Sequence, residues 1–247
     1  MSYYLIGHPL GHSCSPELHG YFGNTDYYLK DLQENELKAF IRNGDYDGLN
    51  VTIPYKQKVA AYMDILSPRA SETGAVNTVV RTRDGRLMGD NTDIEGMEAL
   101  ITSVCPDLEN KNVLILGTGG TAGTADYVAA RHQARSIRHV SRSGEINYEN
   151  VHDLCADTHV LVNTTPVGMY PDFDQKPVDL SRFTQLEAVI DVIYNPLRTA
   201  LTEQAKEMGI PDLMDKIADE TITDDAEGLM AWMAQVDHPA LSMDPLL

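Results

Sequence analysis

The stretch KNVLILGTGGTAG, residues 111–123, constrains the fold more than any other part of the chain. Its apolar start predicts a strand over 111–116 that is buried on both faces of a parallel sheet. The glycines predict a tight turn that opens a helix over 121–132. A strand, a glycine turn and a helix in this order form the context of a dinucleotide-binding fingerprint, in which the helix N-terminus accepts the pyrophosphate. The candidate cofactor-binding residues here are Gly117, Gly119, Gly120, Thr121 and Ala122.

A second cofactor signal follows the next predicted strand, 137–141. Chains that bind NAD usually carry an acidic residue about 20 residues after the glycines, where it binds the ribose 2′-hydroxyl. No carboxylate stands at this place, and Arg142 lies between Ser141 and Ser143 instead. A guanidinium suits a 2′-phosphate by charge and geometry, although a solvated arginine is the plainer alternative. The sequence therefore favours NADP(H), with these three residues as candidate cofactor ligands.

Strand-like and helix-like segments alternate along the whole chain, which predicts an α/β fold with mostly parallel sheets. We expect an N-terminal substrate-binding and catalytic domain over residues 1–100 and a Rossmann-like dinucleotide-binding domain over 101–219. A C-terminal helix, about 220–247, is expected to pack back on the first domain. The predicted strands are 3–6, 27–29, 49–53, 75–81, 111–116, 137–141, 159–163 and 188–193, and the predicted helices are 16–22, 34–41, 55–65, 92–101, 121–132, 199–208 and 229–235. Ser15 is the expected N-cap of helix 16–22, and Asp84-Gly85 is the expected turn of a hairpin.

Charge and cysteine content narrow the class of partner. The chain has 37 acidic and 19 basic residues, a formal net charge of −18, and this charge repels nucleic acid and anionic membranes. Three widely spaced cysteines predict no disulfide framework, and neither a signal peptide nor a membrane span is expected. No metal site is expected. We therefore expect a cytoplasmic protein with a small-molecule substrate, no nucleic-acid or membrane partner, and a monomeric or homodimeric state.

The segment DGLNVTIPYKQK, residues 47–58, contains a predicted strand with two polar residues, Asn50 and Thr52, on one face. Ligands of open α/β sheets bind at the carboxyl ends of strands, and here Pro54 ends the strand and Lys56 follows. The alternative is an exposed lysine in the first turn of a helix, where the helix dipole disfavours a cation. The segment 89–96, GDNTDIEG, supplies carboxylates at another strand–helix junction. A carboxylate beside Lys56 would orient its amine for proton transfer, although one residue of this junction is also expected to cap the helix.

Six motifs in the same order resemble those of the shikimate dehydrogenase family, and they cover almost the whole chain. They are GHPLGHSCSPELH (7–19), GLNVTIPYK (48–56), GAVNT (74–78), GDNTDIEG (89–96), NTTPVGM (163–169) and DVIYNP (191–196). The resemblance implies the reversible, NADPH-dependent reduction of 3-dehydroshikimate to shikimate in aromatic amino-acid biosynthesis.

The resemblance also implies roles for individual residues. Lys56 and Asp93 would form the catalytic pair. The substrate would be bound by Ser13, Ser15, Thr52, Asn77, Tyr194 and Gln235. Thr164 and Met169 would join the cofactor-binding residues of the glycine turn.

Two departures from the family pattern leave alternatives open. The motif after strand 137–141 lacks a second basic residue, and the C-terminal region around Gln235 is unusually acidic before the helix and is cut short by Pro239. The alternatives are a quinate/shikimate dehydrogenase that uses NAD(H), a catalytically inactive sensor of shikimate or a nucleotide, and a different two-domain Rossmann dehydrogenase.

Overall fold

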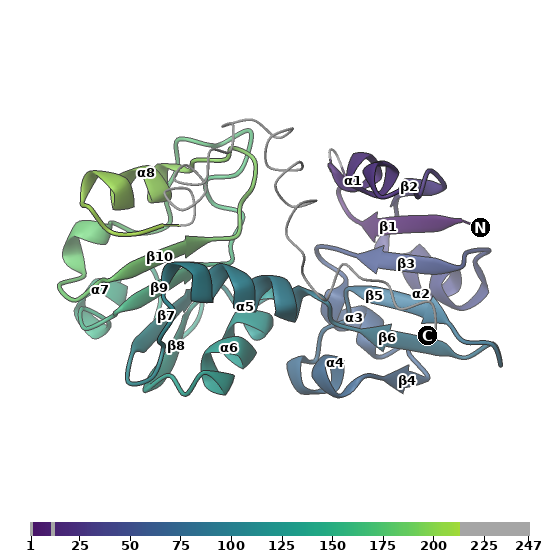
Figure 1. The fold of residues 1–247 in the computed structure, drawn as a ribbon, viewed down its shortest axis with the longest axis horizontal. Helices are drawn as coiled ribbons and strands as arrows, with labels where there is room; N and C mark the ends of the chain where they lie inside the picture. The colour runs from purple at the N-terminus through teal and green to yellow at the C-terminus, as the bar shows by residue number, and fades with distance from the viewer. Residues whose placement is uncertain (1, 11–12, 213–247) are drawn as a thin grey trace. The chain divides into compact units, whose positions relative to one another are not determined.

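The computed structural model of the chain describes residues 2–10 and 13–212. Contacts within the chain define two compact units, Met1–Ile94 and a second unit that begins at Glu95, and each is drawn with its elements in Figure 1. Both units are α/β structures, so the predicted fold class is confirmed. Gln235, the helix predicted at 229–235 and the predicted packing of residues 220–247 lie outside the described residues.

The first unit is built on a six-stranded sheet in the order β2-β1-β3-β5-β6-β4. Its elements are β1 (Tyr3–Gly7), α1 (Ser15–Tyr21), β2 (Tyr27–Asp31), α2 (Glu34–Asn43), β3 (Gly48–Val51), α3 (Lys56–Ala60), β4 (Ile65–Leu66), α4 (Pro68–Thr73), β5 (Thr78–Arg81) and β6 (Leu87–Asp90). Strand β1 pairs in parallel with β2 and β3, and β5 is antiparallel to both its neighbours. Leu49 and Val51 of β3 pack into a core with residues of α2, α3 and α4, so Asn50 faces the opposite side of the sheet, as the alternation predicts.

The hairpin of β5 and β6 brings two predicted site segments together. Its turn contains Gly85 with a φ of 81°, which a glycine adopts without strain, and the turn predicted at Asp84-Gly85 is confirmed. In the antiparallel register Thr78 lies opposite Asp90. The segment after β6 therefore lies beside the residue that precedes β5, Asn77.

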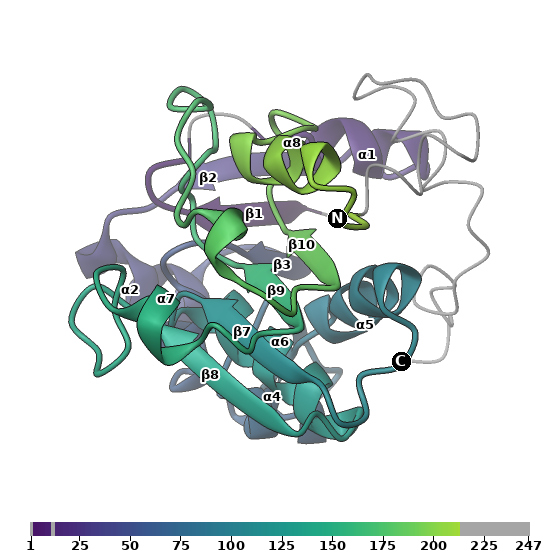
Figure 2. The same cartoon turned by 90° about the vertical axis from the view of Figure 1, so that its left-hand side faces the viewer.

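The second unit contains a four-stranded parallel sheet in the order β10-β9-β7-β8. Its elements are α5 (Asp93–Val104, which starts in the first unit), β7 (Asn112–Leu116), α6 (Gly120–Arg131), β8 (Ser136–Val140), α7 (Val151–Leu154), β9 (Val160–Asn163), the 3₁₀ helix η1 (Leu180–Arg182), β10 (Ala188–Asp191) and α8 (Ala200–Glu207). Helices lie on both sides of this sheet (Figure 2), and β7, β9 and β10 are buried along their whole length. The chain leaves β7 toward β8 on one side and reaches β9 on the other, so a topological switch point lies between β7 and β9.

Two local predictions in the first unit are wrong, and one helix was not predicted. Ser15 is the first residue of α1 rather than its N-cap, because its hydroxyl interacts with Ser13 and caps no backbone group. The helix predicted over 55–65 ends at Ala60, and Ile65 instead pairs with β6 in the short strand β4. The helix α4 was not predicted, although Ser67 caps it by accepting the N–H of Ala70 at 3.2 Å.

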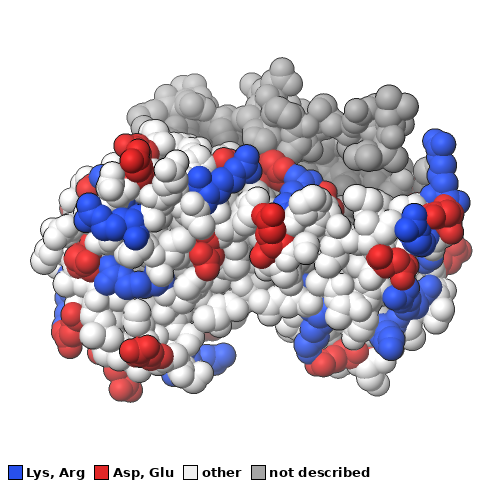
Figure 3. Space-filling model, turned by 90° about the horizontal axis from the view of Figure 1, so that it is seen from below, with Lys and Arg blue, Asp and Glu red and all other residues white. Residues whose placement is uncertain are grey.

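The surface drawn in Figure 3 carries Lys and Arg side chains interspersed with Asp and Glu side chains. The negative net charge of the chain is therefore not gathered into one patch on this face. Within the described part of the chain, no helix combines the length and the apolar character that a membrane crossing needs.

Candidate active site

Lys56 and Asp93 form an ion pair within the first unit. Nζ of Lys56 lies 2.6 Å from Oδ2 of Asp93, and only 16% of the lysine side chain is exposed. Lys56 is the first residue of α3, so it does lie in the first turn of a helix, where the dipole disfavours its charge. The carboxylate of Asp93 offsets this cost, and partial burial strengthens the attraction relative to a fully solvated pair.

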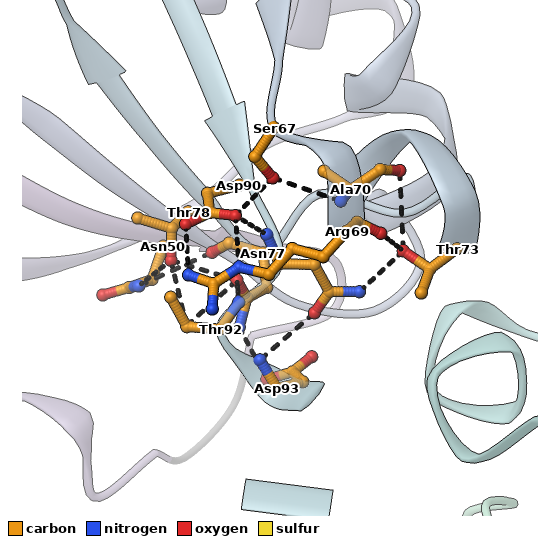
Figure 4. A network of polar contacts seen from close by, with 11 residues as sticks. Asn50, Ser67, Arg69, Ala70, Thr73, Asn77, Thr78, Asp90, Thr92 and Asp93 are labelled. Carbon is orange, nitrogen blue, oxygen red and sulfur yellow. Dashed lines mark hydrogen bonds and ion pairs between the residues drawn. The ribbon is translucent and has the colours of Figure 1, made fainter. Parts of the chain in front are cut away.

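Asn77 orients the carboxylate of Asp93, as Figure 4 shows. Its side-chain amide donates to Oδ1 of Asp93 at 2.6 Å, while its own oxygen accepts the N–H of Thr92 at 2.8 Å. The side-chain oxygen of Asn91 accepts the N–H of Asp93 at 3.1 Å, so one free N–H at the start of α5 is satisfied by this side chain. Both oxygens of Asp93 are thus bonded, one to Lys56 and one to Asn77, and the ammonium group is held in one place.

The predicted carboxylate-binding serines lie on the loop after β1 and at the start of α1. The hydroxyl of Ser13 donates to that of Ser15 at 2.9 Å, and both side chains are partly exposed. Thr52, one residue beyond β3, packs against Gly7, where an added Cβ would lie 2.6 Å from the threonine methyl group. Thr52 and the end of β1 are therefore fitted to each other. The bonds described above join Lys56, Asp93 and Asn77 directly, but not the serines or Thr52.

Tyr27 and His19, which the sequence analysis did not single out, adjoin the polar face of the first sheet. The Tyr27 hydroxyl donates to Oδ1 of Asn50 at 2.8 Å, and the rings of Tyr27 and His19 stack with centroids 3.8 Å apart. Burial raises the pKa of Tyr27, so this hydroxyl stays protonated, and burial lowers the pKa of His19. These two residues hold Asn50 through contacts between distant segments, which leave no local signal in the sequence.

The glycine turn of the second unit lies at the switch point of its sheet. Gly117 has a φ of 114°, and an added Cβ would lie 2.7 Å from the hydroxyl oxygen of Thr164, which follows β9. Gly119 precedes α6, and a Cβ there would meet nothing within 4 Å. The turn thus leaves open space at a helix N-terminus, which fits the phosphates of a dinucleotide. Ala122 is buried, so its side chain is not exposed to a ligand.

Other predicted cofactor residues follow the strands of the same sheet. Ser141 follows β8, and Arg142 and Ser143 are exposed beyond it. Within the part of the chain that the structure describes, no side chain forms a hydrogen bond or ion pair with the Arg142 guanidinium. Met169 and Tyr194 are also exposed, in the loops after β9 and β10.

Asp191, at the end of β10, is a buried carboxylate within the DVIYNP motif. Its Oδ1 accepts the side-chain amide of Asn163 and the N–H of Ile193, both at 3.1 Å, and its Oδ2 accepts the Thr199 hydroxyl at 2.8 Å. Burial raises the pKa of Asp191 to about 6, even though these three hydrogen bonds favour the ionised form. Asp191 thereby fixes both ends of the loop that carries Tyr194.

The chain has two α/β units, of which one is Rossmann-like, and a lysine–carboxylate pair held by Asn77. These features define a class of two-domain α/β proteins. Comparisons with known proteins identify the family within this class. Residues 5–79 match the family described as the shikimate dehydrogenase substrate binding domain. A second match, to the C-terminal region of the ACS/CODH beta family, spans residues 184–247, most of which lie outside the described residues. A relative from Shouchella clausii, named shikimate dehydrogenase (NADP(+)), is 38% identical over 230 residues, which cover 83% of each chain.

Solved structures agree with the match to shikimate dehydrogenase. Shikimate dehydrogenase 1 from Peptoclostridium difficile superposes with a TM-score of 0.77 at 28% identity, covering 95% of this chain and 97% of that one. Quinate dehydrogenase from Corynebacterium glutamicum in complex with NAD superposes with a TM-score of 0.73 at 26% identity, covering 86% and 87%. The chain belongs to the shikimate dehydrogenase family.

Proposed function

We propose that the protein is an NADP-linked shikimate dehydrogenase, which reversibly reduces 3-dehydroshikimate to shikimate, with Lys56 and Asp93 as its catalytic pair. The observation that carries the proposal is the 2.6 Å contact between the Lys56 ammonium and an Asp93 carboxylate that Asn77 holds from its other side. The S. clausii relative, whose name includes both shikimate and NADP(+), supports the choice of substrate and cofactor.

In the proposed mechanism, NADPH supplies the hydride when bound. Lys56 donates a hydrogen bond to the ring ketone, stabilises the negative charge that develops on its oxygen, and gives it a proton. Asp93 keeps Nζ in place during this transfer. In the oxidation of shikimate the pair accepts the hydroxyl proton. Ser13 and Ser15 bind the substrate carboxylate through hydroxyl groups, which place no second cation beside Lys56.

The cofactor is held by the turn from Gly117 to Ala122, by Thr164 and Met169, and by the segment from Ser141 to Ser143. The free space at Gly119 suits the pyrophosphate, and the exposed Arg142 is available for the 2′-phosphate of NADP(H). The proposed substrate-binding set is completed by Thr52, Asn77, Tyr194 and Gln235. The proposal places the protein in the cytoplasm as a monomer or homodimer, and its three free cysteines, Cys14, Cys105 and Cys155, fit a reducing compartment.

Initial rates of cofactor reduction test the proposal, with shikimate or quinate paired with NADP⁺ or NAD⁺. We expect strong activity only with shikimate and NADP⁺. Comparable rates with quinate and NAD⁺ would assign the protein to the activity of the C. glutamicum structure instead. If none of the four reactions proceeds but calorimetry still detects shikimate binding, the protein would be a sensor instead of an enzyme.

Cofactor preference depends on Arg142 in this proposal. We expect Arg142→Ala to lower the ratio of kcat/KM for NADP⁺ to that for NAD⁺ by about 10- to 100-fold, the value of a charge-assisted contact to a phosphate. Rates with NAD⁺ should stay near those of the wild type. Arg135→Ala is the matched control, because Arg135 is also an exposed arginine of the second unit. An unchanged ratio in Arg142→Ala would remove this residue from the cofactor site.

A further inference from the structure

An ion pair outside the proposed catalytic pair includes Asp90, which lies three residues before Asp93 in the chain. Arg69 of α4 and Asp90, the last residue of β6, meet through two parallel contacts, with Nε of Arg69 2.7 Å from Oδ1 of Asp90 and a second guanidinium nitrogen on Oδ2 (Figure 4). Both side chains are partly buried. Such a bidentate pair fixes the orientation of the carboxylate as well as its position.

The orientation of Asp90 determines the path of the chain toward Asp93. Its Oδ1 also accepts the backbone N–H of Asn91 at 2.8 Å and the hydroxyl of Ser67, which caps α4. The backbone carbonyl of Asp90 accepts the N–H of Asn77 at 3.0 Å. One aspartate thus ties together α4, the first residue after β6 and the residue that holds Asp93.

A second connection runs from α4 to the same segment. The Asn91 amide donates to the hydroxyl of Thr73 at 3.0 Å, and that hydroxyl donates to the backbone carbonyl of Arg69 at 2.8 Å. The oxygen of the Asn91 side chain accepts the N–H of Asp93. The residues between Asp90 and Asp93 are therefore held from both ends of α4.

The charge of Asp90 makes Arg69 essential to this arrangement. Burial opposes ionisation, but the bonds from Arg69, Ser67 and Asn91 outweigh it and lower the pKa of Asp90. The carboxylate is ionised at neutral pH. Without Arg69, a partly buried anion would keep only neutral donors and would move toward water.

We propose that Arg69 and Asp90 are positioning residues, whose bidentate pair sets the place of Asp93 and through it the contact between Asp93 and Lys56. The inference rests on the proposed function, since it concerns the same catalytic pair. Neither residue is assigned a step in the reaction. Their effect is geometric, and a misplacement of about 1 Å at a catalytic group costs roughly 100-fold in rate.

The test compares Arg69→Gln, Arg69→Lys and Asp90→Asn with Arg42→Gln. Arg42 is the matched control, because it also pairs with an aspartate of the first unit, Asp64, whose other oxygen likewise accepts a backbone N–H. We expect Arg69→Gln and Asp90→Asn to lower kcat/KM for shikimate by about 10- to 100-fold. Arg69→Lys keeps the positive charge but cannot form the bidentate contact of a guanidinium, so its loss of kcat/KM should be intermediate. The kcat/KM of Arg42→Gln should stay within about twofold of the wild-type value.

A double-mutant cycle separates positioning from general stability. If Arg69 acts through Asp93, adding Arg69→Gln to an Asp93→Asn enzyme should lower the residual rate by no more than about twofold. A full additional loss in that background, or an undiminished rate in the single variant, would overturn the proposal.

Hydrogen exchange supplies a readout that needs no activity. Arg69→Gln should speed exchange in the peptide that carries the N–H groups of Asn91 and Asp93 by about 10-fold or more, and Arg42→Gln should not. Unchanged exchange there would also overturn the proposal. An inactive wild-type protein would refute the proposed function alone, and exchange would then decide the positioning role by itself.

Discussion

Replacing Lys56 by alanine is expected to lower kcat for shikimate oxidation by about 10²- to 10⁴-fold, the usual contribution of a positioned general acid or base. Binding should change much less, because the proton transfer develops in the transition state and not in the bound ground state. The measurement is steady-state kinetics with shikimate and NADP⁺, together with shikimate affinity by calorimetry.

Lys58→Ala is the control for the Lys56 experiment. Lys58 belongs to the same short helix and also forms an ion pair, with Glu34 at 2.6 Å, but that pair is exposed. Loss of such a surface pair costs about 0–1 kcal/mol of stability and should leave kcat unchanged. A Lys56→Ala enzyme with normal turnover and weak shikimate binding would instead make Lys56 a binding residue.

The second large effect concerns stability and pH, and it arises at Asp191. The pKa of this carboxyl is about 6 in the folded protein and 3.8 in its ordinary state. Between about pH 4 and pH 6 the unfolded chain loses a proton that the folded chain keeps, so the free energy of unfolding falls as pH rises. The difference between the two pKa values corresponds to a total decrease of about 3 kcal/mol in the free energy of unfolding over the whole titration.

Asp191→Asn removes this proton linkage and preserves the local hydrogen bonds. The side-chain oxygen of an asparagine can accept the hydrogen bonds that Asn163 and Ile193 donate to Oδ1 of Asp191. Its amide group can donate a hydrogen bond to the Thr199 hydroxyl. The free energy of unfolding of the variant, minus that of the wild type, should rise by about 2.4 kcal/mol from pH 4 to pH 7, because the carboxyl of the unfolded chain is already partly ionised at pH 4. Urea unfolding followed by circular dichroism at several pH values measures this difference.

Asp179→Asn is the control for the pH experiment. The hydrogen bonds from Gln204 and Ser181 lower the pKa of Asp179 to about 2. The stabilising effect of the Asp179 carboxylate is therefore lost only as the pH falls below about 4. The free energy of unfolding of Asp179→Asn, minus that of the wild type, should show no rise between about pH 4 and pH 7. A flat profile for Asp191→Asn would mean that Asp191 is already ionised within the fold at pH 4.

Local patterns in the sequence predicted the elements that carry the site, and in places they misled. The apolar run before Gly117 and the glycines after it leave only a buried parallel strand and a helix start, and both are present. A serine followed by proline occurs both at Ser15, where the hydroxyl interacts with Ser13, and at Ser67, where the hydroxyl caps a helix. A local pattern cannot say which of two competing partners a hydroxyl takes.

Long-range partners were the least predictable part of the site. The residues alone predicted a carboxylate of segment 89–96 beside Lys56, the family resemblance implied that it is Asp93, and the structure places these two side chains in contact. The bond from Tyr27 to Asn50 and the pair of Arg69 with Asp90 join residues more than 20 positions apart. Nothing in the sequence around these residues marks their partners, since the tertiary fold brings them together.

The hairpin of β5 and β6 determines where the chain tolerates a change of length. Its ladder keeps Thr78 opposite Asp90, and the turn at Asp84 and Gly85 lies at the far end of the two strands. Residues inserted at that tip lengthen the loop and leave the pairing intact. One residue inserted inside either strand would turn its side chains to the other face and separate Asn77 from Asp93. The tip is therefore a suitable place to graft a peptide tag or a fluorescent label.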